Sequence, residues 1–110
     1  MAINYKILGQ QHPAATTSVT LYTVPTATQT VVSSITIANV TAVTGYARVY
    51  IRAAGAAVAH LYAILYDVPI LPNSTQAFTL GITISATDVI SVRSTNGADL
   101  TFHAYGSEIV

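Results

Sequence analysis

The stretch Tyr46-Ala47-Arg48-Val49-Tyr50-Ile51-Arg52-Ala53 alternates strictly between large polar or aromatic side chains and small or aliphatic ones. Successive side chains of a β-strand point to opposite faces of its sheet, so this pattern predicts a strand with one apolar face. Residues 60–66 continue the alternation with further aromatic side chains. If these two strands pair, their tyrosines and arginines stack in one patch on the outer face of the sheet.

The flanking sequence predicts more short strands. Thr, Val and Ile make up 39 of the 110 residues, and such β-branched side chains favour sheets over helices. Gly, Pro and Asn-Gly turn signals bound strands at 5–10, 18–24, 30–40, 46–53, 58–67, 75–80, 88–95 and 100–106, and Pro69 and Pro72 frame a connection that crosses between layers. The sequence therefore predicts one all-β domain over residues 1–110: a single antiparallel β-sandwich, jelly-roll or Ig-like, of about eight strands.

The apolar positions of these strands give a predicted core. Its members are Val31, Ile35, Ile37, Val49, Ile51, Leu61, Leu65, Leu80, Ile90, Val92, Leu100 and Phe102.

Charge is unusually sparse. Only 7% of the residues are charged, against about 25% in typical soluble domains, and the net charge is zero. The surface is then either coated with Thr and Ser hydroxyls or covered by neighbouring subunits. Lys6 is the only lysine available to protect an edge strand from pairing with another chain. We therefore expect a homo-oligomer, with a trimer as the first choice.

Tyr and Arg are enriched in protein interfaces, so the aromatic and cationic face is the predicted interface. The other possibilities are a solvated outer face and a ligand-binding face. The predicted interface residues are Tyr46, Arg48, Tyr50, Arg52, Tyr62 and Tyr66.

Several other functions are not expected. The four acidic residues show no paired spacing, and no nucleophile, phosphate-binding or cysteine motif is present, so we expect no enzyme and no cofactor. His12, His60 and His103 lack the local spacing of a metal site. There is no basic patch for nucleic acid and no apolar run that would span a membrane. The N-terminal segment lacks the pattern of a signal peptide, so we expect synthesis in a cytoplasm.

Three further segments carry a resemblance. They are Leu21-Tyr22-Thr23-Val24-Pro25 followed by Val31-Val32-Ser33-Ser34-Ile35, then Leu80-Gly81-Ile82-Thr83-Ile84-Ser85-Ala86-Thr87-Asp88-Val89-Ile90-Ser91-Val92, and finally Tyr105-Gly106-Ser107-Glu108. Together they resemble small β-sandwich virion structural proteins of tailed bacteriophages, over most of the chain. The turn at Arg52-Ala53-Ala54-Gly55 and the terminal segment fit that pattern only loosely.

The resemblance implies a virion structural protein, either a capsid cement or decoration protein or a neck or tail component. Such a protein is made in the host cytoplasm and binds copies of itself and a larger major capsid or tail protein. The alternative is the receptor-binding, carbohydrate-binding module of a phage tail fibre, with Tyr46, Tyr50, Tyr62 and Tyr66 as a platform for sugar rings. A pilus or surface-layer subunit is a third possibility, which the missing signal peptide disfavours.

Overall fold

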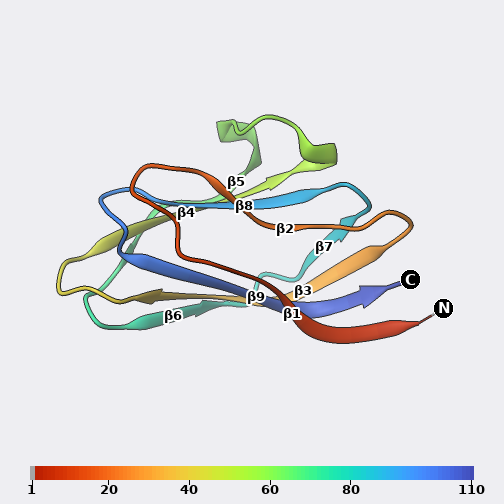
Figure 1. The fold of residues 1–110 in the computed structure, drawn as a ribbon, viewed down its shortest axis with the longest axis horizontal. Helices are drawn as coiled ribbons and strands as arrows, with labels where there is room; N and C mark the ends of the chain where they lie inside the picture. The colour runs from red at the N-terminus through yellow and green to blue at the C-terminus, as the bar shows by residue number, and fades with distance from the viewer. Residues whose placement is uncertain (1) are drawn as a thin grey trace.

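The computed structural model describes residues 2–110 and consists of two antiparallel sheets packed face to face (Figure 1). Sheet A has the order β1 (Ile3–Gln11), β9 (Leu100–Ile109), β3 (Gln29–Asn39) and β6 (Thr75–Phe78), and β7 (Ile82–Ser85) also pairs with β3. Sheet B has the order β2 (Val19–Thr23), β8 (Val89–Ser94), β4 (Gly45–Arg52) and β5 (Ala63–Ile70). The predicted all-β sandwich is confirmed, with nine strands where about eight were expected.

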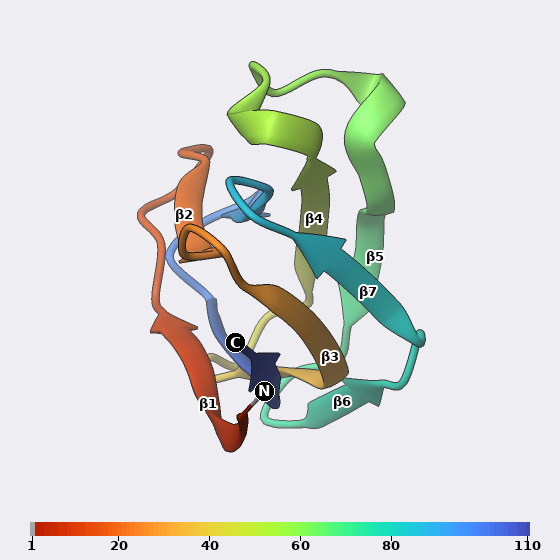
Figure 2. The same cartoon turned by 90° about the vertical axis from the view of Figure 1, so that its right-hand side faces the viewer.

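The segment between β4 and β5 departs most from the prediction. A strand was expected over residues 58–67, but β5 begins only at Ala63. The residues between β4 and β5 instead contain two short 3₁₀ helices, η1 (Ala53–Gly55) and η2 (His60–Tyr62). Figure 2 shows the segment projecting beyond the end of β4, and Figure 1 shows it on the outer side of sheet B. Pro69 lies inside β5, an edge strand where its missing N–H is tolerated, so the crossing connection starts after Ile70.

The core between the sheets contains most of the predicted residues. Ile35, Ile37, Val49, Ile90, Val92, Leu100 and Phe102 are all completely buried. Ile51 and Leu65 are partly buried and pack against this cluster. The predictions for Leu61 and Leu80 were wrong, since these side chains are 82% and 45% exposed. Leu61 lies in η2 rather than in a strand, and Leu80 lies in the turn between β6 and β7.

A β-bulge at Ser33 changes which residues of β3 face the core. The register with β9 pairs Val32 with Gly106 and then Ser34 with Tyr105, which leaves Ser33 as an extra residue. The buried positions are therefore Thr30 and Val32 before the bulge and Ile35 and Ile37 after it. Val31, which was predicted to be in the core, points outward beside Ser107 and is only half-buried.

The sheet edges are protected mainly by bulges, a proline and short strands, since Lys6 on β1 is the single lysine of the chain. The edge strand β1 has a bulge at Leu8, β2 has one at Leu21, and β5 carries Pro69. Strands β6 and β7 span only four residues each. Bulges, prolines and short edge strands all hinder pairing with another chain. Association with a partner would consequently use the outer faces of the sheets rather than their edges.

Candidate functional site: an arginine pocket on the outer face of sheet B

A bulge in β5 builds the centre of the site. The register with β4 pairs Ala47 with Val68 and Val49 with Leu65, so Tyr66 and Asp67 together oppose the single residue Arg48. Asp67 adopts a φ of 51°, a left-handed conformation that Asp tolerates better than most residues. Both bulged residues contact the same guanidinium group. The Cζ of Arg48 lies 4.1 Å from the ring centroid of Tyr66, which confirms the predicted stacking of Tyr and Arg.

Asp67 holds this arginine through two parallel hydrogen bonds. Arg48 donates from Nε to Oδ1 of Asp67 at 2.8 Å and from Nη2 to Oδ2 at 3.1 Å. The hydroxyl of Thr95 donates to Oδ1 of the same carboxylate at 2.6 Å. These donors, with Arg48 first, lower the pKa of Asp67 to about 2, and the same pairing raises the pKa of Arg48. Asp67 therefore stays ionised across the physiological pH range.

A second arginine lies directly opposite the first. Arg48 of β4 pairs with Arg93 of β8, so both side chains project from the outer face of sheet B. With Tyr50, Val58, Ala59 and His60 they line an open pocket of about 430 Å³. His60 closes one side of it and packs edge-on against Tyr66, with ring centroids 5.2 Å apart. The pocket thus combines two cations with aromatic and aliphatic walls.

The six predicted interface residues lie on one side of the molecule but differ in accessibility. Tyr66 is 46% exposed, whereas only 2% of Tyr50 is exposed. Tyr46, Arg48, Arg52 and Tyr62 are half-buried. Arg52 donates to the Ser91 hydroxyl at 2.9 Å and to the Ala56 carbonyl at 2.7 Å, so it ties the segment between β4 and β5 down onto the sheet. Their role as an interface stays a prediction.

The histidines do not gather into one site. His12 and His103 line a shallow depression at the start of β9, while His60 lies on sheet B. His12 donates from Nδ1 to the Leu100 carbonyl at 3.0 Å, and Gln10 donates to Nδ1 of His103 at 3.2 Å. Over residues 2–110 no cluster of three metal-ligating side chains occurs. In the same part of the chain, no helix has the length and apolar character needed to cross a membrane.

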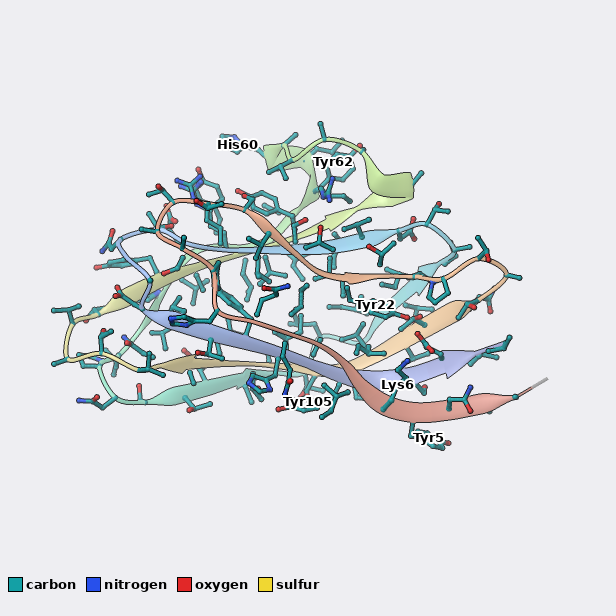
Figure 3. All side chains as sticks on the ribbon, viewed as in Figure 1. Tyr5, Lys6, Tyr22, His60, Tyr62 and Tyr105 are labelled. Carbon is teal, nitrogen blue, oxygen red and sulfur yellow. The ribbon has the colours of Figure 1, made fainter. Side chains whose placement is uncertain are left out.

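The outer face of sheet A is a second surface, which the sequence reasoning missed. The register places Ile3, Tyr5 and Ile7 of β1 on this face beside Tyr105 of β9, and Figure 3 shows Tyr5 and Tyr105 pointing away from the sandwich. Ile3, Tyr5 and Ile7 are 47%, 83% and 54% exposed. The only charged residues in the strands of sheet A, Lys6 and Glu108, point to the other side. This face therefore carries no formal charge: an apolar stripe of Ile3, Tyr5 and Ile7 along β1 gives way to polar side chains, such as Thr36 and His103, towards β3.

Glu108 belongs to a polar cluster between the sheets. The hydroxyl of Tyr22, from sheet B, donates to Oε2 of Glu108 at 2.5 Å and lies 2.8 Å from Oγ1 of Thr30. Lys6 donates to Oε1 of Glu108 at 3.2 Å. The hydrogen bond from Tyr22 is the main cause of a lowered pKa at Glu108, and burial is the main cause of a raised pKa of about 12 at Tyr22. The cluster joins both sheets near the chain termini (Figure 3).

Comparison with known proteins gives a fold but no family. No family model and no curated protein sequence matches the chain. A chain from the structure of infectious bursal disease virus, Gx strain, is similar, with a TM-score of 0.50 and 14% sequence identity. The match covers 97% of this chain but only 32% of the viral chain, so the protein spans about a third of that length. The β-sandwich seen here therefore also occurs within a larger viral chain.

Proposed function

We propose that the protein is a non-enzymatic virion structural protein of a bacteriophage, a capsid cement or decoration protein or a neck or tail component. It binds copies of itself and a larger shell or tube protein. The observation that carries this proposal is the uncharged outer face of sheet A, whose edge strand β1 exposes Ile3, Tyr5 and Ile7, with Tyr5 83% exposed. Exposed apolar patches such as this stripe on β1 mark interaction sites, because leaving them in water is unfavourable. The sandwich that it shares with a viral chain is consistent with this role.

The uncharged face suits a second copy of the same chain. A face without charges meets its own counterpart without repulsion and without burying an unpaired ion. Sheet A is four strand positions wide and its strand β9 is ten residues long. At the usual strand spacing and rise this amounts to about 600 Å² of flat area. The value is comparable with the roughly 800 Å² of accessible surface that each partner buries in a standard interface.

Self-association should depend on Tyr5 and Ile7. We expect the wild-type protein to form an oligomer in sedimentation velocity and the double variant Tyr5→Glu/Ile7→Glu to sediment as a monomer, because a buried contact would then contain unpaired carboxylates. Both side chains are exposed, so the β-rich circular dichroism spectrum should not change. Leu61→Glu is the matched control, since Leu61 is 82% exposed above sheet B, and it should still associate.

The sedimentation mass also gives the size of the oligomer. A trimer suits the threefold and quasi-threefold positions of a particle, whereas a face that packs on its own counterpart gives a twofold dimer. A wild-type protein that stays monomeric at high concentration would contradict self-association. An oligomer that survives Tyr5→Glu/Ile7→Glu would contradict the assignment of this face.

A further inference from the structure

The pocket on sheet B has an excess of positive charge. Arg48 and Arg93 are direct cross-strand neighbours, and like charges in this position repel each other. Asp67 supplies the one negative charge that lies beside them, and the positive charge of Arg93 also contributes to the lowered pKa of Asp67. Two guanidinium groups and one carboxylate leave a net charge of about +1 at the pocket. This excess calls for one further anion.

Arg93 has a buried nitrogen that no residue between 2 and 110 satisfies. Asp67 already accepts two hydrogen bonds from Arg48 and one from Thr95, so its oxygens are engaged. The Nε of Arg93 is buried, and within residues 2–110 no acceptor lies at hydrogen-bond distance from it. A buried donor without an acceptor costs about 1–3 kcal/mol, and more when it is charged. An unsatisfied buried group of this kind is an exception in folded proteins, and a bound anion would account for it.

We propose that this pocket binds the carboxylate of an Asp or Glu side chain from the larger partner protein. A carboxylate brings the single negative charge that is missing, and its two oxygens match the planar fork of a guanidinium group. Only the identity of the molecule that carries the carboxylate rests on the proposed function. The pocket itself follows from the positions of Arg48, Arg93 and Asp67.

A second copy of this chain is a poor source of that carboxylate. Asp67 is bound to Arg48, and Glu108 is buried and bound to Tyr22. Asp99 is only 8% exposed. Asp88 accepts hydrogen bonds from the backbone N–H groups of Ser85 and Ala54, at 3.0 and 2.8 Å. Because all four acidic side chains are engaged or buried, the anion comes from a different molecule.

The surroundings of the pocket favour a protein over a sugar. Val58 and Ala59 form one wall, and Val58 is 43% exposed. Tyr66, which contacts both Arg48 and His60, is 46% exposed. Arginine and tyrosine are the residues that are enriched in the energetically dominant sites of protein interfaces. A hydrophilic sugar would find few hydrogen-bond partners along the aliphatic wall.

The test is an NMR titration of the full chain with a blocked tripeptide, Ala-Glu-Ala, and with its uncharged Ala-Gln-Ala analogue. We expect millimolar binding of the acidic peptide alone, with shift changes at Arg48, Tyr50 and Arg93. Arg93→Gln should weaken binding about tenfold, the effect of losing a charge-assisted hydrogen bond. Lys6→Gln removes the same charge from sheet A, outside the pocket lining, and should change the affinity less than about twofold, because only screened long-range attraction is lost.

A second variant of Arg93 and two alternative anions complete the test. If Arg93→Gln does not fold, Arg93→Lys keeps the charge but loses the fork, and should also weaken binding. Glucuronic acid and inorganic phosphate are titrated as alternative anions. Equal binding of both peptides, an unchanged affinity in both Arg93 variants, binding of glucuronate or phosphate without the acidic peptide, or no binding at all would overturn the proposal. None of these outcomes affects the self-association through sheet A, which sedimentation tests separately.

Discussion

Gly106→Ala should destabilise the protein by about 3 kcal/mol, because overpacking against backbone cannot relax easily. Gly106 is buried opposite the bulge in β3. A Cβ atom built there would overlap the carbonyl oxygen of Val31 and lie 3.0 Å from the Cα of Val32. Both obstacles are backbone atoms of the central strand of sheet A. Urea unfolding at neutral pH, followed by circular dichroism, measures the loss.

Gly81→Ala is the matched control for this substitution. Gly81 has a φ of 62°, but a Cβ atom there would meet no atom within 4 Å. The same chemical change should therefore cost only the backbone strain of a left-handed alanine, about 1 kcal/mol. Equal losses for the two variants would show that crowding at the bulge contributes nothing.

Tyr22→Phe should cost about 2 kcal/mol at neutral pH, because it removes a buried hydrogen bond to an ionised carboxylate. Tyr22 and Glu108 are 7% and 8% exposed, so water does not readily replace the lost hydroxyl. Tyr105→Phe is the matched control. The Tyr105 hydroxyl only accepts a 3.4 Å hydrogen bond from Thr36 on the outer face of sheet A, so its removal should cost less than about 0.5 kcal/mol.

The pH dependence of the Tyr22→Phe effect identifies its cause. The pKa of Glu108 is lowered in the folded protein, mainly by Tyr22, so this stabilisation is present above the pKa of the unfolded chain, which has an ordinary value of 4.5. This stabilisation is lost as the pH falls through the lowered pKa that Glu108 has in the folded protein. The difference between wild type and Tyr22→Phe should therefore shrink below about pH 4. A difference that stays constant down to pH 2 would mean that packing, not the carboxylate, is responsible.

The ionisation of Tyr22 changes the stability of the protein at alkaline pH, in the opposite direction to the effect of Glu108. Burial raises its pKa from 10.0 to about 12, so the stabilisation is complete below pH 10. It is lost as the pH rises from 10 towards 12, because only the unfolded chain ionises its tyrosine in this range. Tyr22→Phe should lack this part of the alkaline destabilisation, whereas Tyr105→Phe should retain it.

The strand pattern was readable from the sequence because its side-chain period is 2. The alternation of residues 46–53 correctly placed Val49 in the core and Arg48 on the outer face, and the pairing of β4 with β5 confirmed the contact between Arg48 and Tyr66. The bulges at Ser33 and Asp67 were not readable. Each inserts one residue and reverses the alternation, and no local residue pattern signals this reversal.

The same difficulty explains what was missed in the candidate site. Arg93 lies in the strand predicted over residues 88–95 but was not singled out, because its position opposite Arg48 depends on the pairing of β8 with β4, which are far apart in the sequence. The uncharged face of sheet A depends on which way Lys6 and Glu108 point. The one available signal was Ile3, Tyr5 and Ile7, three large apolar residues at alternate positions of the first strand.

The most direct test of the proposed function is an electron-microscopy map of the virus particle that carries this chain. The proposal predicts many copies per particle. Neighbouring copies should contact each other through Tyr5 and Ile7 on the outer face of sheet A, and the pocket at Arg48 and Arg93 should face a carboxylate of a larger shell or tube protein. A few copies at the tips of fibres, with both faces exposed to solvent, would contradict it.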